Sequence, residues 1–419
     1  MSVAPSMPSF SSVSPARWCV IALGVAIPLS VALDNLLLAI LLVLMLIGGS
    51  RAVLHTTMHN PVARASILLF AGLLLGVAYG NTPMAEALGV LGKYADLAFV
   101  PLLMVAVRDA GTRRHAMLGF LAVMLVTALL SWLVGLHVIP VSKWMWRGCE
   151  PNNPAIFRSS ITQNILMAYA SYLLALQACE QQTVRSKAML IGLAALACGS
   201  VLFMVQGRTG YLVVLALGVY LAWTVFARKL HSRGRGFGWR EGAGMGLLTL
   251  VLVFGVYHAS SRLHDRVNLV LTEFKAWQAN GSNGSSTGDR ADFYYNTFEL
   301  VKRHPLLGVG TGGFPAAYAE QVRDKGVTLT RNPHNEYLLI TVQIGLAGFA
   351  LLLYLFYTQW RHAARLPGIF EQDAARGLVL TIAVTSLFNS PLLDHTEGLF
   401  FAFASAMLFA HSEYGKKYG

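Results

Sequence analysis

The octapeptide RNPHNEYL at Arg331–Leu338 is followed by LITVQIGLAGFALLLYLFY, a nearly uncharged run that ends at Tyr357. An apolar run of this length predicts a membrane-spanning helix. His334 then lies at the membrane–water boundary, beside the guanidinium of Arg331 and the carboxylate of Glu336. Ionisable side chains are expensive at such a depth, so a cluster of them marks a candidate functional site.

The composition of the whole chain agrees with a membrane protein. Of its 419 residues, 55% are hydrophobic and only 12% are charged, whereas soluble domains carry about 25% charge. The apolar runs have the length of helices and do not alternate, which excludes an outer-membrane barrel. We therefore expect an all-α polytopic membrane protein with about twelve transmembrane helices, at 18–32, 35–49, 65–80, 94–107, 116–138, 160–178, 188–205, 209–227, 243–259, 336–357, 377–390 and 397–411.

These runs divide the chain into three parts. Residues 1–259 hold nine predicted transmembrane helices, residues 260–335 form one large polar loop, and residues 336–419 hold three more helices and a short tail. Lysine and arginine gather in alternate short loops, and the side rich in them is the cytoplasmic one. This pattern predicts that both termini are cytoplasmic and that His334 faces the opposite side.

The large loop has an internal order of its own. Residues 260–278 alternate apolar and polar side chains at helical spacing, which suits a helix on the membrane surface. Residues 279–288 (ANGSNGSSTG) predict a flexible hinge. Asp289 is a candidate N-cap for a second helix that ends near Arg303. Arg290 would then stand in the first turn, where the helix dipole disfavours a cation unless an anion is close.

The loop also carries an excess of basic residues, from Arg262 to Arg331. One interpretation is a basic surface beside anionic lipid headgroups. The other is a pocket for a phosphate-bearing substrate, since arginine offers paired donors to phosphate oxygens. Arg208, within QGRTG at 206–210 between two apolar runs, has the same two interpretations: it either reaches toward headgroups or faces a phosphate.

A glycine-rich segment, GVGTGGF at 308–314, formally satisfies the G-x-G-x-x-G pattern. The dinucleotide-binding interpretation needs a preceding strand in a soluble α/β unit, so we reject it. Gly310 and Gly312 instead indicate a sharp turn with close backbone approach, or a nest of N–H groups that faces a substrate anion.

The residues around His334 suggest supporting roles. Asn335 is a candidate cap for the following helix, and Glu336 is placed to orient the imidazole or to pair with an arginine. The alternative interpretation is that His334 has no catalytic role and is a hydrogen-bonded histidine at the membrane–water interface. Asp394 and His395, in a short loop near 391–396, form a second and weaker candidate pair.

The sequence lacks the motifs of disulfide frameworks and metal sites. Cys19, Cys149, Cys179 and Cys198 show no paired or metal-type spacing, and D-x-D, H-E-x-x-H and C-x-x-C are absent. A hydrolase nucleophile elbow is unsupported too, because the formal G-x-S-x-G match, GSSTG at 284–288, lies in the expected hinge. We therefore expect neither a metal nor a cofactor.

The motifs taken together resemble the O-antigen ligase and O-antigen polymerase superfamily of bacterial inner membranes. The similarity rests on QGRTG at 206–210, Arg290 within TGDR, RHPLLGVGTGGF at 303–314, PHNEYL at 333–338 and IGLAGF at 344–349. It covers roughly residues 190–360, and it looks most like a ligase.

This resemblance implies a glycosyltransferase with a periplasmic active site. Its donor is a glycan on undecaprenyl pyrophosphate and its acceptor is the lipid A–core oligosaccharide; it acts among membrane lipids, without metal, nucleotide sugar or nucleic acid. Arg208 and Arg290 would hold the pyrophosphate, and His334 would be the general base for an inverting transfer. The alternatives are an O-antigen polymerase, which elongates the glycan on its carrier, and a transporter of the lipid-linked glycan.

Overall fold

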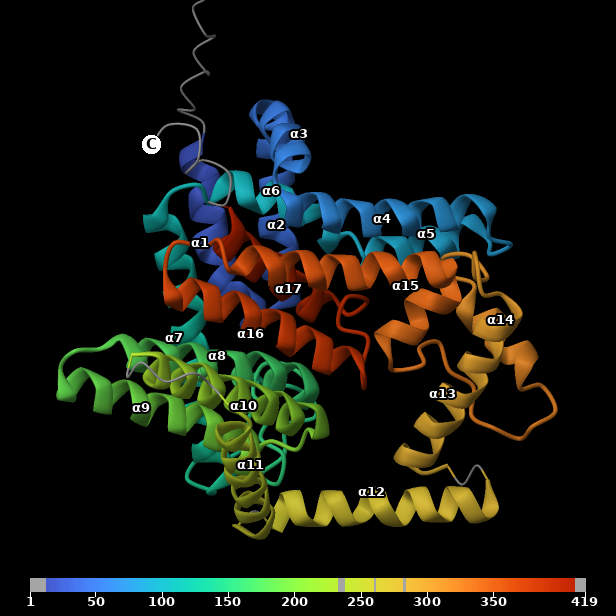
Figure 1. The fold of residues 1–419 in the computed structure, drawn as a ribbon. Coiled ribbons are helices and arrows are strands. Elements are labelled where there is room, and N and C mark those ends of the chain that lie inside the picture. The colour runs from blue at the N-terminus through green and yellow to red at the C-terminus, as the bar shows by residue number, and fades with distance from the viewer. Residues whose placement is uncertain (1–12, 233–237, 260, 282–283, 411–419) are drawn as a thin grey trace, which may run out of the picture.

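A computed structural model of the chain describes residues 13–232, 238–259, 261–281 and 284–410, which form a bundle of helices (Figure 1). Within these ranges extended pairing is limited to one isolated bridge between Glu150 and Asn153, so the all-α prediction is confirmed. In chain order the helices are α1 (Val13–Leu29), α2 (Val31–Gly48), α3 (Ser50–His59), α4 (Pro61–Tyr79), α5 (Met84–Lys93), α6 (Asp96–Ala106), α7 (Ala110–Gly135), α8 (Ser160–Glu180), α9 (Val184–Gly199), the π-helical turn η1 (Ser200–Met204), α10 (Arg208–His231), α11 (Trp239–Ala259), α12 (Ser261–Asn280), α13 (Ser286–Arg303), α14 (Phe314–Gln321), α15 (Glu336–Ala363), α16 (Ile369–Ser386) and α17 (His395–Phe409).

Several of these helices are suited to crossing a membrane. In the described part of the chain, six segments are both long and apolar enough: α2, α4, α7, α9 with η1, α10 and α15. Helices α5 and α6, which meet at a bend of 41°, make a seventh if they count as one span. The protein is therefore a multi-pass membrane protein, while the count of about twelve spans stays a prediction.

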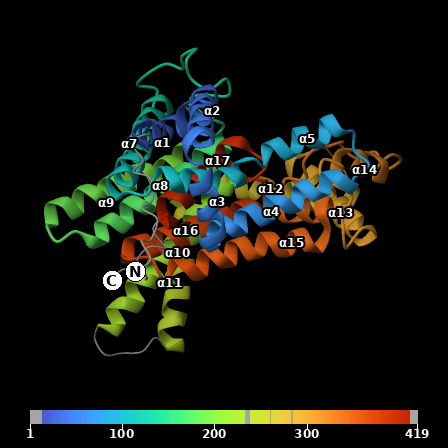
Figure 2. The ribbon, with the colours of Figure 1, turned by 90° about the horizontal axis from the view of Figure 1, so that it is seen from above.

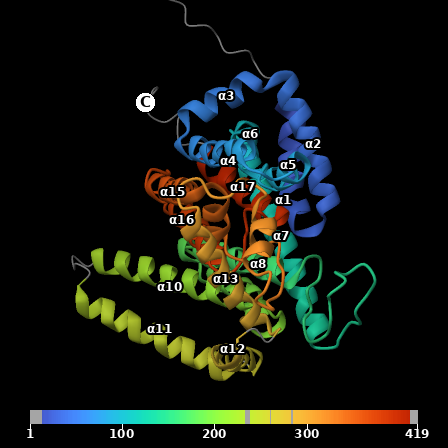
Figure 3. The ribbon, with the colours of Figure 1, turned by 90° about the vertical axis from the view of Figure 1, so that its right-hand side faces the viewer.

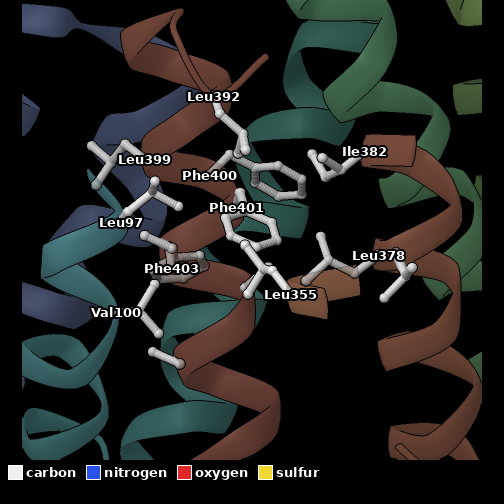
Figure 4. Packing of buried hydrophobic residues seen from close by; sticks show 14 of the residues in the cluster. Leu97, Val100, Leu355, Leu378, Ile382, Leu392, Leu399, Phe400, Phe401 and Phe403 are labelled. Atoms are coloured by element: carbon white, nitrogen blue, oxygen red, sulfur yellow. The ribbon is translucent and has the colours of Figure 1, made fainter. Parts of the chain in front are cut away.

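The core is built around α17, whose sequence is apolar on every side. A helix of this kind is buried on all faces, and its residues from Thr396 to Phe409 are buried. Figure 4 shows Phe400, Phe401 and Phe403 packed between side chains of α6, such as Leu97, and of α16, such as Ile382. This packing fixes the 387–394 segment, which enters α17, against the rest of the bundle.

Helix α15 is broken at one point, and the break has a clear chemical cause. Ile344 and Gly345 leave helical geometry, with φ of 69° at Gly345. Only glycine adopts this conformation without strain, and a Cβ there would lie 1.9 Å from the carbonyl oxygen of Leu306. The break leaves backbone groups without helical partners, and these must be paired elsewhere in a membrane protein.

The glycine-rich turn at 308–313 supplies those partners. The N–H groups of Val309 and Gly310 donate to the carbonyls of Val342 and Gln343, at 2.8 and 2.9 Å. On the other side of the break, the N–H of Leu346 donates to Pro305, also at 2.8 Å. The break and the turn therefore form one joint, which ties the end of the large loop to the bundle.

Figure 2 shows α4 and α15 side by side, and α4 completes the joint. The N–H of Thr311 donates to the carbonyl of Gly76 at 3.1 Å, and its hydroxyl donates to Leu73 at 2.7 Å. Glycine at position 310 allows this approach, since a Cβ there would stand 2.4 Å from Gly80.

The segment between 260 and 335 is more helical than the sequence suggested. It contains α12, α13 and the unpredicted α14. Helix α12 includes the first two residues of the expected hinge, and α13 begins within the hinge at Ser286. Residues 282 and 283 lie outside the described part. In Figures 1 and 3, α10, α11 and α12 lie together along one side of the molecule, and α12 packs on α13.

One predicted cap was wrong. The N-cap of α13 is Ser285, whose hydroxyl accepts from the N–H of Gly288 at 3.1 Å, and Asp289 lies inside the helix. Arg290 thus stands beyond the first turn, so the argument from an unfavourable dipole does not apply to it. Helices α3 and α5 were not predicted either, because they are short and less apolar than their neighbours.

We expect Gly345→Ala to destabilise the protein, because the new Cβ meets a carbonyl and the backbone lies in the left-handed region. The loss should exceed about 2 kcal/mol, measured as thermal unfolding in detergent. Gly218→Ala is the matched control, since no atom lies within 4 Å of its Cβ. Equal melting temperatures for the two variants would contradict the role of the joint.

Candidate active site

His334 has an unusual backbone. Its φ of 55° lies in the left-handed region, which costs a residue other than glycine roughly 1–2 kcal/mol. Two contacts hold it there: its N–H donates to Oδ1 of Asn332 at 2.8 Å, and its carbonyl accepts from the hydroxyl of Tyr294 at 3.0 Å. Asn332 Oδ1 also accepts from the hydroxyl of Ser390 at 2.8 Å, so the strained turn is tied to the 387–394 segment.

The imidazole of His334 is set up to stay neutral. It stacks on the ring of Phe293, with centroids 6.2 Å apart, and it is half-buried. Burial lowers the pKa of His334, and the positive charge of Arg290 lowers it further. A neutral imidazole can accept a proton at neutral pH, as a general base requires.

Arg208 is the first residue of α10, and its approach depends on the glycines beside it. A Cβ at Gly207 would lie 2.5 Å from the side-chain nitrogen of Asn164 on α8, which explains the close packing of this turn. The Arg208 guanidinium donates to the hydroxyl of Thr287 at 2.9 Å and lies 3.6 Å from the carboxylate of Glu273. The guanidinium therefore reaches from α10 to both α12 and α13.

Arg290 and Arg208 line the same two cavities, which differ in character. The first is apolar, has a volume of about 430 Å³, and is lined by Arg208, Tyr211, Leu212, Val267, Val270, Leu271, Phe274, Thr287, Arg290, Ala291, Tyr294 and Phe388. The second is polar, has a volume of about 230 Å³, and is lined by Asn153, Ser160, Ile161, Gln206, Gly207, Arg208, Thr209, Ser286 and Arg290. The two guanidinium groups thus stand at the boundary between an apolar space and a polar one.

Asn389 connects the arginine side of the site to the histidine side. Its side-chain amide donates to the hydroxyl of Thr209, next to Arg208, at 2.7 Å. Its carbonyl accepts from the N–H of Glu336, two residues after His334, at 3.1 Å. One buried residue therefore sets the spacing between the starts of α10 and α15.

The two residues after His334 have structural partners. Asn335 is the N-cap of α15, as predicted, and accepts from the N–H of Leu338 at 3.0 Å. Glu336 is fully buried and accepts from the hydroxyl of Tyr94 and the N–H of Leu392, both at 2.9 Å. Its carboxylate therefore ties the bend between α5 and α6 to the 387–394 segment. The side chain of Arg331 is exposed.

The glycine turn favours the first of its two sequence interpretations. Gly310 donates to the carbonyl of Gln343, and Gly312 donates to its side-chain oxygen at 3.0 Å. With Thr311 paired to α4, these N–H groups are engaged within the protein. The turn is a structural joint and not an anion-binding nest.

His395 and Asp394 are not among the residues that line the two cavities. Nε2 of His395 is 2.9 Å from Asp34, and Nδ1 is 3.7 Å from Asp96. Arg158, which lies just before α8, pairs with the same Asp34 at 3.0 Å. These charged side chains therefore connect α2, α6 and α17 with the segment that leads into α8. Asp394 is the N-cap position of α17.

Sequence reasoning missed Glu273, Thr287, Tyr294 and Asn389, which complete the surroundings of the three named residues. Thr287 stands in the TGDR segment, but nothing in that segment marked it as a site residue, and the other three belong to no local motif. Each acts across 14 to 180 positions of sequence, as the Glu273–Thr287 and Asn389–Thr209 bonds illustrate. The sequence offered only composition as a sign of their role: Glu273 and Thr287 lie in a segment rich in basic residues.

Three features describe the candidate site: a multi-pass bundle, two arginines that line both an apolar and a polar cavity, and a histidine whose pKa is lowered by burial and by Arg290. Residues 193–353 match the family model of O-antigen ligases, and this segment contains Arg208, Arg290 and His334. Over this segment the chain is similar to the O-antigen ligase superfamily, as the sequence motifs indicated. The chain matches no curated protein.

We expect Arg290→Gln to raise the pKa of His334 toward its ordinary value, because a nearby positive charge disfavours the protonated imidazole. The measurement is a pH titration of labelled histidines by NMR, with the His334 signal assigned by its loss in a variant. Arg331→Gln is the control and should leave the titration unchanged. An unchanged titration in Arg290→Gln would contradict the electrostatic contact.

Proposed function

We propose that the protein is an O-antigen ligase, which transfers a glycan from undecaprenyl pyrophosphate to the lipid A–core oligosaccharide. The observation that carries this proposal is the position of Arg208 and Arg290 between the apolar and the polar cavity. A lipid-linked glycan has the same order of parts: an apolar tail, a pyrophosphate and a polar sugar chain.

The donor fits this arrangement part by part. The polyprenyl tail would lie in the apolar cavity along α12, against side chains such as Val270 and Phe274. The pyrophosphate would meet the two guanidinium groups, which bind phosphate oxygens through paired N–H donors. The first sugar would then enter the polar cavity beside Ser160 and Gln206.

The chemistry requires little more than these groups. The acceptor hydroxyl oxygen attacks the anomeric carbon, and the bond from that carbon to the pyrophosphate breaks with its electron pair. Arg208 and Arg290 stabilise the negative charge that grows on the leaving phosphate, which is worth most in a site of low dielectric. A single displacement of this kind inverts the anomeric configuration.

His334 would take the proton of the attacking hydroxyl. A sugar hydroxyl is a poor nucleophile until that proton moves, and a neutral imidazole is suited to accept it. The contacts with Asn332 and Tyr294 hold the histidine backbone for this purpose. We place this site on the periplasmic face of the bacterial inner membrane, with both termini in the cytoplasm, from the distribution of basic residues.

We expect His334→Ala, Arg208→Ala and Arg290→Ala each to abolish the lipopolysaccharide ladder when expressed in a ligase-deficient strain. In a purified assay, His334→Ala should lower the transfer rate by ~10²–10⁴-fold, the range of a lost general base. Arg323→Ala, whose exposed side chain pairs with Glu320, is the control and should keep the ladder. A ladder of normal strength in His334→Ala would refute the assignment of the base.

The pH dependence gives a separate test. The base works unprotonated, and the pKa of His334 lies below its ordinary value of 6.5. We therefore expect the transfer rate of the wild type to be constant above pH 6.5 and to fall only as the pH drops through that lowered pKa. An acid limb that persists unchanged in His334→Ala would show that another group titrates.

An O-antigen polymerase would use the same donor, and a third experiment separates it from the ligase. Loss of a ligase leaves long glycan on the carrier and none on lipid A. Loss of a polymerase leaves single repeat units on lipid A. We expect a deletion strain to show the first pattern, measured by separating carrier-linked from lipid A-linked glycan.

A further inference from the structure

Glu273 of α12 lies where the proposed pyrophosphate would bind. Its carboxylate accepts from the N–H of Thr287 at 3.0 Å and also from the hydroxyl of the same residue. The same oxygen is 3.6 Å from the guanidinium of Arg208, which itself donates to the Thr287 hydroxyl at 2.9 Å. One carboxylate oxygen of Glu273 thus accepts two hydrogen bonds from Thr287 and forms an ion pair with Arg208.

This set of donors is one that a phosphate oxygen would also use. Thr287 is the second residue of α13, an 18-residue helix, so its N–H points away from the helix at the positive end of the dipole. Backbone N–H, hydroxyl and guanidinium groups are the usual ligands of phosphate at a helix N-terminus. Here a carboxylate of the protein itself occupies the position.

We propose that Glu273 is a built-in competitor for the donor: its carboxylate fills part of the pyrophosphate site, and the arriving phosphate displaces it and takes over Thr287 as a third ligand beside the two arginines. This inference rests on the proposed function. It adds Thr287 to the residues that bind the phosphate. Glu273, by contrast, would weaken phosphate binding.

The placement of Glu273 on α12 links its displacement to the lipid. Val267, Val270 and Phe274 of the same helix line the apolar cavity, so a polyprenyl tail that fills this cavity contacts the helix that carries the competitor. A second contact keeps α12 in place during the exchange, since Nε1 of Trp277 donates to Asp292 of α13 at 2.9 Å. Only the Glu273 side chain then has to move.

The expected effect is modest, because the Glu273 carboxylate and the Arg208 guanidinium are both partly exposed. Ion pairs of this kind change an equilibrium by about two- to fivefold. Glu273→Gln keeps the size of the side chain and removes its charge. We expect this variant to bind inorganic pyrophosphate about two- to fivefold more tightly, and to lower the KM for the lipid-linked donor by a similar factor with little change in kcat.

The test is calorimetric titration of inorganic pyrophosphate into the full-length protein in detergent, together with transfer kinetics. Glu299→Gln is the matched control: it removes a carboxylate from α13, where Glu299 pairs with Lys302, and should leave both quantities unchanged. Thr287→Val, made in the Glu273→Gln protein, should weaken pyrophosphate binding again, whereas Thr287→Ser should not.

The outcomes separate this inference from the proposed function. If Arg208→Ala abolishes pyrophosphate binding but Glu273→Gln binds as the wild type does, or more weakly, the competitor is refuted and the ligase proposal stands. If Thr287→Val binds as its parent does, Thr287 is no ligand. If the wild type binds no pyrophosphate and transfers no glycan, the proposed function itself fails.

Discussion

The structure depends on the need to pair backbone groups inside an apolar bundle. Gly345 interrupts α15, and the carbonyls released there are satisfied by the turn at 308–313. The turn closes the large segment that begins with α12, so the break holds α13 and its Arg290 near the start of α15. An uninterrupted helix would offer the turn no partners.

The site adds a second constraint, which is spacing. Three elements from distant parts of the sequence, the starts of α10 and α15 and the body of α13, supply Arg208, His334 and Arg290. Asn389 and Tyr294 bridge these elements through backbone carbonyls and hydroxyl groups. These hydrogen bonds fix the distances between side chains that belong to different helices.

The sequence was informative where a pattern is local. The apolar run at 160–178 marked α8 to within two residues, while α15 begins where it was predicted but continues six residues past 357. The Asn335 cap followed from its neighbours. It could not predict that the 308–313 turn docks into the 344–345 break, because each motif alone suggests a turn or a kink. Glu273 is a further example: a carboxylate among many basic residues gives no sign of which arginine it meets.

The left-handed backbone of His334 also restricts how this position can change during evolution. Apart from glycine, the residues that enter this region most readily are asparagine, aspartate and histidine. Of these, only aspartate and histidine are bases, and an aspartate beside Arg290 would be a far weaker one than an imidazole. Glutamate and lysine would have to bear the backbone strain as well as a change of chemistry. The fold around residue 334 thus leaves histidine with little competition for the proposed role of general base.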